Sequence, residues 1–312
     1  MKNIHFFLLC FLKLLIVQQV WAQGCSDAGF CTMGAMKPDQ PFNKKIELKL
    51  RSMEVSFYRG TTTTSVKIYV ATADLNFSLN SKNSFQVKIP YLATQGSFGE
   101  TSGLSDISLC FTRNIFSTEK YDINFSLGTK IPTNQSDLSE DGKPLPMYYQ
   151  TSLGTYDAIA GVSFINRNWL FATGIQHAFN QNENKFLWNT WPDYPSQEYV
   201  QKYGRAYELK RGTDIMLRIE RNFRFSRVNI TLGLLPIYRV NKDEIGTPLS
   251  DERFKLDDAQ GLAMSAIGTA GYSFNVQSGM RFLYGHKIVQ RKENPDGLSR
   301  VEVMTLSYYY RF

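Results

Sequence analysis

The sequence has few residues of the kinds that most enzymes and metal sites use. Its 312 residues include three histidines and four cysteines, and no HExxH, CxxC or GxSxG pattern occurs in it. Only His177 and His286 follow the first 22 residues, and they stand far apart. Two histidines without a cysteine cluster argue against a metal site. We therefore predict no enzyme activity, no metal and no cofactor.

Long apolar runs are missing outside the first residues. The opening segment, MKNIHFFLLCFLKLLIVQQVWAQG, has Lys2, an apolar run over 6–17 and then Ala22, which is the layout of a secretory signal peptide. The run is shorter than the roughly 20 residues that a transmembrane helix needs. We predict a signal peptide over 1–22, cleaved after Ala22. The AQGC sequence leaves open a lipoprotein alternative, with Cys25 acylated.

Basic runs are also missing. The formal net charge is +7, but Lys and Arg are scattered, so nothing predicts binding to nucleic acid. Cys25 and Cys31 could form a disulfide in an oxidising compartment, whereas Cys110 stands alone within an expected strand. The segment 23–44 has no strand pattern. It is expected either to be disordered in the periplasm or to fold into a barrel lumen as a plug.

Period-two segments recur throughout residues 45–312. In SDISLCF and TDIMLRIE, apolar and polar residues alternate, and the polar faces carry charges of both signs. The expected strands cover 45–58, 65–79, 84–92, 104–116, 120–131, 156–166, 168–179, 212–224, 227–240, 261–274, 276–289 and 299–312. The apolar phase slips near Ser52 and near Thr72, which indicates bulges or wrong limits.

The gaps between these strands alternate in length. Tight gaps fall at 80–83, 117–119, 166–167, 225–226 and 275, and most of the intervening gaps are long: 93–103, 132–155, 180–211, 241–260 and 290–298. Outer-membrane barrels have short periplasmic turns and longer extracellular loops. We therefore predict one domain over 45–312, an all-β, up-and-down transmembrane β-barrel of about 12 antiparallel strands in the outer membrane of a Gram-negative bacterium.

The polar strand faces predict which residues line the lumen. The candidates are Lys88, Asp106, Asp122, Lys130, Asp157, Asp214, Arg218, Glu220, Arg281, Lys287 and Arg311. Charges of both signs could pair and hold the shape of the barrel, or they could line a narrow path.

The longest expected loop, within 180–211, is rich in aromatic residues: Phe186, Trp188, Trp191, Tyr194, Tyr199, Tyr203 and Tyr207. Such a loop could pack on itself and on the barrel rim. Alternatively, it could capture a small hydrophobic ligand.

Three stretches carry a resemblance to a known family. In SGLSDISLCF, YDINFSLGTKIPTNQSDL and PMYYQTSLGTYDAIAGVSF, the shared positions are Gly103, Leu104, Ser105, Asp106, Gly128, Lys130, Pro132, Thr133, Gln150, Gly154 and Asp157. Over roughly 85–180 the chain resembles outer-membrane barrels of the phenol meta-degradation pathway, which are related to long-chain fatty-acid transporters. Ser105, Asn134 and Thr155 depart from the family pattern. The resemblance implies passive uptake of small apolar or aromatic compounds.

The last expected strand, SRVEVMTLSYYYRF, places Tyr308, Tyr310 and Phe312 on one face. Barrels that resemble this one use such a strand as a signal to the barrel assembly machinery. Outer-membrane lipid, that machinery and a small hydrophobic ligand are therefore the expected partners. The expected function is passive transport. The alternative is a non-transporting barrel with a structural role or a role in secretion machinery.

Overall fold

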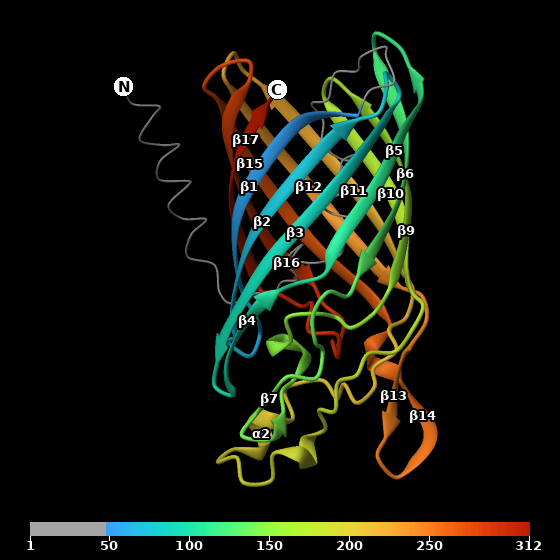
Figure 1. Ribbon diagram of the computed structural model, residues 1–312, viewed down its shortest axis with the longest axis vertical. Helices are drawn as coiled ribbons and strands as arrows, with labels where there is room; N and C mark the ends of the chain where they lie inside the picture. The colour runs from blue at the N-terminus through green and yellow to red at the C-terminus, as the bar shows by residue number, and fades with distance from the viewer. Residues whose placement is uncertain (1–47) are drawn as a thin grey trace.

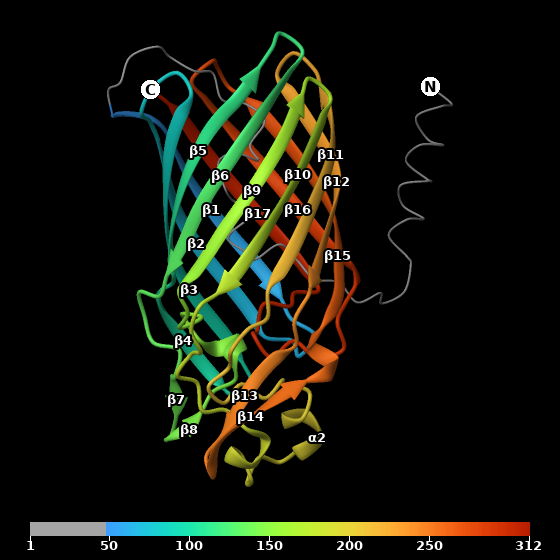
Figure 2. The same cartoon turned by 90° about the vertical axis from the view of Figure 1, so that its right-hand side faces the viewer.

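The computed structural model describes residues 48–312, which form a closed antiparallel β-barrel of twelve wall strands (Figure 1, Figure 2). The predicted fold class is confirmed. The segments 1–22 and 23–44, with Cys25 and Cys31, lie outside the described residues. Around the barrel the wall strands are β1 (Lys49–Thr61), β2 (Lys67–Ser78), β3 (Asn83–Gly96), β4 (Gly99–Leu104) with β5 (Ile107–Ser117), β6 (Tyr121–Ile131), β9 (Asp157–Asn166), β10 (Trp169–Ala178), β11 (Asp214–Arg224), β12 (Val228–Arg239), β15 (Gly261–Ser273), β16 (Ser278–Val289) and β17 (Glu302–Arg311).

Two details of this order complete the wall. β4 and β5 share one position, because both pair with β3. The last strand, β17, pairs with β1 from Ser52 opposite Arg311 to Thr61 opposite Glu302. This pairing closes the barrel and removes the free edges that an open sheet would expose. Within residues 48–312, no helix combines the length and the apolar character needed to cross a membrane.

Alternation sorts the wall residues onto two faces. On β17, Met304, Leu306 and Tyr308 are exposed, whereas Val303 and Ser307 are buried. Exposed apolar side chains recur at every second position along much of the wall, and buried, often polar, side chains stand between them. The exposed face is the outside of the barrel and the buried face is its inside. An apolar outside and a largely polar inside are what a barrel in a lipid bilayer requires.

The predicted bulge near Ser52 is present, because the pairing of β1 with β2 shifts register between Leu50 and Ser52. The expected irregularity near Thr72 is not a bulge, since β2 pairs regularly with both of its neighbours there.

The phase of β2 slips for a different reason. Its inward residues Ile68 and Val70 are buried in the apolar cluster at one end of the barrel, whereas Asp74, farther along the same face, is a buried polar residue. The inner face of β2 therefore changes from apolar to polar along the strand, and the pairing stays regular.

The expected long gap at 93–103 is wrong. β3 continues to Gly96 and β4 returns from Gly99, so only Ser97 and Phe98 join them. Gly99 has a backbone φ of 135°, a conformation that residues other than glycine rarely adopt. This hairpin of β3 and β4 extends the wall at the loop end (Figure 1), and Phe98 lies in its turn.

The connections at the two ends of the barrel differ in length, as the sequence predicts. At the tight-turn end, shown at the top of Figure 1 beside the C-terminus, strands are joined by residues 79–82, 118–120, 167–168, 225–227 and 274–277. At the opposite end, called the loop end, the long connections are 132–156, 179–213, 240–260 and 290–301.

The loop end holds secondary structure that the sequence does not predict. Two small hairpins and four short helical segments lie there: β7 (Ser139–Glu140), β8 (Lys143–Pro144), η4 (Met147–Tyr149), η5 (Trp188–Thr190), α2 (Gln197–Val200), β13 (Asp243–Thr247), β14 (Ser250–Leu256) and η6 (Asp257–Ala259). Together these segments form a cap over the loop end (Figure 2).

Deletion of Phe312 is predicted to reduce assembly more than stability. Its side chain is 65% exposed and its ring packs edge-on against Tyr310, with centroids 5.0 Å apart. Its backbone N–H donates to the carbonyl of Arg51, so the deletion removes little packing. The measurement is the amount of barrel in the outer membrane, compared with the unfolding temperature of purified barrel. Normal membrane levels of the variant would refute an assembly role.

Candidate functional site: the barrel interior and its cap

Toward the tight-turn end, polar side chains on the inner face bond to one another. Asn114 donates to Asn124 at 2.9 Å, and Thr231 donates to Asn222 at 2.8 Å. These four residues come from two pairs of neighbouring strands, β5 with β6 and β11 with β12. Cross-strand bonds of this kind pair buried polar groups, although the side-chain nitrogen of Asn222 has no hydrogen-bond partner among the described residues.

The predicted lumen residues lie mostly in ion pairs within the wall. Lys88 lies 3.6 Å from Asp74, Lys130 lies 3.9 Å from Asp106, and Arg281 lies 3.6 Å from Glu54. Arg218 bonds to Glu220 along the same strand. Lys88 and Asp74 lie on the neighbouring strands β3 and β2, Asp106 precedes β5 beside β6, and Arg281 on β16 reaches past β17 to Glu54 on β1. These pairs across the wall are the arrangement expected if the charges hold the wall in shape.

The remaining candidates have local partners. Asp122 accepts from Ser117 at 2.5 Å, and Lys287, fully buried, donates to Ser299 at 3.0 Å. Arg311 lies over the ring of Tyr309, 5.1 Å from its centroid. That the eleven candidates line a transport path stays a prediction.

A buried charge cluster lies where the wall meets the cap. Arg239, the last residue of β12, is fully buried and bonds three carboxylates: Asp214 at 2.7 Å, Asp243 at 2.6 Å and Asp296 at 2.8 Å. Arg291 approaches Asp214 at 3.6 Å and Asp296 at 3.7 Å. The cluster thus ties segments 240–260 and 290–301 to the wall strands β11 and β12.

A second ion pair belongs to the same region. Arg211 bonds Asp157, the first residue of β9, and both side chains are nearly inaccessible to solvent. Asp106 accepts from Ser152 at 2.5 Å and from the backbone N–H of Leu153 at 3.1 Å. Of the eleven predicted residues, the structure therefore brings Asp106, Asp157, Asp214 and Lys287 into contact with the loop-end connections.

The charge of Asp296 is fixed by this cluster. Burial alone would raise the pKa of its carboxyl, but Arg239, Arg291 and Arg211 together hold that pKa well below its usual value. The backbone N–H of Leu298 also donates to it at 3.1 Å. Asp296 is therefore ionised at neutral pH and fastens segment 290–301 electrostatically.

An apolar cluster also lies on the inner face. Its buried members come from six strands and are Cys110, Ile159, Leu170, Ala172, Met216, Leu235 and Ile267. Ile165, Ile237 and Leu283 pack against it. Inward polar residues adjoin it, since Leu235 is opposite Ser265 on β15 and Ala172 is opposite Ser163 on β9. The barrel interior thus contains an apolar surface among polar residues, which the sequence analysis did not predict.

The aromatic loop packs into the cap around Phe98. The ring of Phe98 lies 4.5 Å from that of Trp191, 4.7 Å from Tyr194 and 5.0 Å from Tyr203. Trp191 also donates to the carbonyl of Pro144 at 2.7 Å. The cluster includes Ile68 and Val70 of the wall, so the loop packs on itself and on the barrel rim, the first of the two predicted arrangements.

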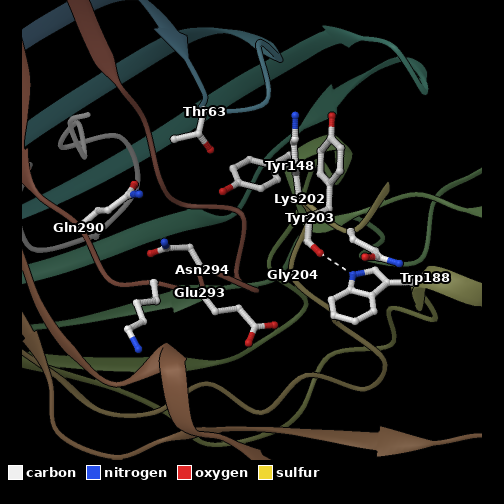
Figure 3. A pocket seen from close by; sticks show the side chains of 11 residues that line it. Thr63, Tyr148, Trp188, Lys202, Tyr203, Gly204, Gln290, Glu293 and Asn294 are labelled. Carbon is white, nitrogen blue, oxygen red and sulfur yellow. Dashed lines mark hydrogen bonds between the residues drawn. The ribbon is translucent and has the colours of Figure 1, made fainter. Parts of the chain in front are cut away.

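A polar cleft opens within this cap (Figure 3). It has about 460 Å³ of empty space, part of it open to solvent, and is lined from four connecting segments by residues that include Tyr148, Trp188, Lys202, Gln290 and Glu293. Trp188 donates to the carbonyl of Tyr203 at 2.8 Å. Burial raises the pKa of Glu293 and raises that of Tyr148 to about 12. The lining is mainly polar, so the cleft does not suit the apolar ligand that the loop composition suggests.

The two histidines lie apart on the outer face. His177 shares a hydrogen bond of 2.9 Å with Thr213, and His286 stacks on Tyr284 with ring centroids 6.4 Å apart. Among residues 48–312, no group of three or more His, Cys, Asp or Glu side chains is arranged to hold a metal ion. The absence of enzyme activity stays a prediction.

Most partners of the charged residues were not predicted from the sequence. Asp74 is hidden by the change of phase in β2, and Arg239 follows the apolar inward residues Leu235 and Ile237 at the end of β12. The parity of β12 could have placed Arg239 on the inner face. Arg211, Arg291 and Asp296 lie in connections that follow no period, so no periodic signal identifies them.

No protein-family model and no curated protein sequence matches the chain. Among solved structures, the fold is similar to the COG4313 outer membrane channel from Pseudomonas putida F1, with a TM-score of 0.58 and 11% identity over 88% of this chain and 100% of that one. Weaker similarities include the KdgM porin (TM-score 0.44, 5% identity, 84% and 99% covered) and the CymD monoaromatic hydrocarbon channel (TM-score 0.40, 10% identity, 93% and 98% covered). The similarity to the COG4313 channel places the fold among outer-membrane barrels. The resemblance to phenol meta-degradation and fatty-acid transport proteins stays a prediction.

Proposed function

We propose that the protein is a passive channel for small apolar or aromatic compounds in the outer membrane of a Gram-negative bacterium. The observation that carries this proposal is the apolar cluster on the inner face of a closed barrel. Leu170, Leu235 and Ile267 are almost fully buried in the interior. A solute that crosses the barrel would meet these packed apolar side chains, which favour apolar solutes and disfavour ions, because ions would lose hydration there. The similarity to an outer-membrane channel supports the same function.

A non-transporting barrel is the second candidate. The cap and the ion pairs of Arg239 favour it, because they fill the loop end with buried, mutually satisfied groups. The two functions differ in one measurement, the permeability of liposomes that contain the purified barrel. A channel releases a small entrapped aromatic solute faster than protein-free liposomes do, and a sealed barrel does not.

Changing the inner apolar surface is predicted to alter selectivity. The variant Leu170→Ser with Ile267→Ser should weaken the contact of an apolar solute by about 1.5 kcal/mol, which is about tenfold in partitioning. Flux of a small aromatic compound should fall, and ionic conductance in planar bilayers should rise.

The matched control is Thr231→Ser with Thr112→Ser. It also changes two inward residues but keeps their hydroxyl groups, and it should leave both fluxes unchanged. Folding of each variant is checked by the shift in gel migration on heating. Equal aromatic flux in the folded serine variant and the wild type would contradict a role for the apolar cluster.

A further inference from the structure

The tight-turn end carries a rim of basic side chains. Four of its five turns hold one each, namely Lys82, Lys120, Arg167 and Arg227, and all four are exposed. Glu119 is the single acidic residue in these turns. The rim therefore has a surplus of positive charge, which spreads from the turn between β2 and β3 to the turn between β11 and β12.

Residues 48–312 do not neutralise the charges of this rim. Within the part of the chain that the structure describes, Lys82, Lys120, Arg167 and Arg227 form no ion pair. Several lysines at the loop end are paired, whereas the exposed Lys202 and Lys210 are not among the ion pairs of the described residues. Lys185 lies 2.6 Å from Glu208, Lys242 lies 2.5 Å from Asp257, and three further pairs are Lys143 with Asp193, Lys255 with Glu244 and Lys292 with Asp258. The loop end also exposes acidic residues, among them Glu183, Glu198 and Glu252, whereas the tight turns expose mainly basic ones.

The rim borders the apolar outer surface directly. Trp169, Phe223 and Phe225 lie within two residues of the turns at 167–168 and 225–227, and each is more than a third exposed. Between the first two lies Arg221, whose guanidinium is 5.0 Å from the Trp169 ring centroid and 5.7 Å from that of Phe223. An arginine that rests on exposed aromatic rings suits the boundary between hydrocarbon and water.

Because the basic rim borders an apolar surface, it favours an anion that also has an apolar part. A soluble anion would need only the charges, whereas a phospholipid can place its phosphate on the rim and its acyl chains against the neighbouring apolar residues. We propose that the basic rim is a binding surface for anionic phospholipid headgroups. This inference rests on the membrane location proposed above and adds a lipid preference to it.

The test compares the lipids that surround the barrel in bilayers of phosphatidylcholine with a minority of phosphatidylglycerol. Spin-labelled forms of each lipid report their association with the protein. The wild type should favour phosphatidylglycerol about threefold, and high salt should reduce this preference. In the rim variant, Lys82, Lys120, Arg167 and Arg227 are all changed to Gln. Its association with phosphatidylglycerol relative to phosphatidylcholine should be close to one.

The matched control changes four loop-end lysines, Lys185, Lys242, Lys255 and Lys292, to Gln. It removes the same number of charges and should keep the preference of the wild type. An unchanged preference in the rim variant would overturn the proposal. A second arm measures binding to purified peptidoglycan without lipid. If the rim variant lost only that binding, the lipid assignment would also be overturned.

Failure of the channel function is distinguishable from failure of this inference. The lipid preference is measured on folded barrel in a bilayer and requires no flux. A barrel that releases no solute but favours phosphatidylglycerol through its rim would contradict the channel alone. A barrel that conducts without any lipid preference would contradict the rim alone.

Discussion

Replacing Arg239 with methionine is expected to lower the free energy of unfolding by about 3–5 kcal/mol, because it leaves buried carboxylates without their partner. Asp214, Asp243 and Asp296 all bond to this guanidinium. Their repulsion should release segment 290–301 from the wall. We therefore also expect a larger conductance than that of the wild type. Unfolding in urea and single-channel recording in planar bilayers measure the two effects.

The control for this variant is Lys242→Met, which breaks the exposed pair with Asp257. Exposed pairs are screened by solvent and contribute little to stability, so this control should unfold and conduct like the wild type. Similar stability of the Arg239 and Lys242 variants would contradict the role of the cluster.

The difference in stability between the wild type and the Arg239→Met variant should also depend on pH. The pKa of Asp296 is held below its usual value, with burial opposed by Arg239 and Arg291. Its ionised form therefore stabilises the fold above pH about 4, and this contribution is lost as the pH falls toward the lowered pKa. The Arg239→Met variant lacks most of this contribution. The stability difference from the wild type should accordingly narrow below pH about 4.

The variant Phe98→Ala is expected to loosen the cap while the wall remains closed. Removing a buried aromatic side chain costs about 3–5 kcal/mol, and Phe98 packs on Trp191, Tyr194 and Tyr203 from segment 179–213. This energy is lost mainly in the cap, so segment 179–213 should become sensitive to protease. The shift of gel migration on heating, which reports the wall, should persist.

Phe254→Ala is the control for this change. Phe254 lies on β14, also at the loop end, but its side chain is 51% exposed. Its truncation should leave the cleavage rate in 179–213 unchanged. If Phe98→Ala were cleaved no faster than Phe254→Ala, the central role of Phe98 in the cap would be wrong.

The wall of this barrel could be predicted from its sequence because each strand has two chemically different faces. Period two indicated strands near the observed positions for all twelve wall positions, and the gap lengths separated the two ends. The prediction failed where the interior is itself apolar. Ile68 on β2 and Leu235 on β12 face inward, so polarity alone assigns them to the wrong side.

The candidate site was predicted less completely. Inward charges on the wall, such as Lys130, Asp106 and Asp214, follow from parity. Which of them pair, and the bond of Asp214 to Arg239, depend on register and on strand ends. The cap could not be predicted in detail, because Phe98, Trp191 and Asp296 meet through contacts between connections that have no regular period. Composition suggested an aromatic cluster, and tertiary packing determined its form.

The pairing of β17 with β1 has a consequence for the order of folding. Most other wall pairs join strands that are neighbours in sequence, whereas Ser52 and Arg311 come from opposite ends of the described chain. Joining such distant residues in a flexible chain costs about 5 kcal/mol of loop-closure entropy. If hairpins form first, each shortens the effective distance between the ends, so this cost falls step by step. The seam between β1 and β17 should therefore be the last part of the wall to form and the part that limits the folding rate.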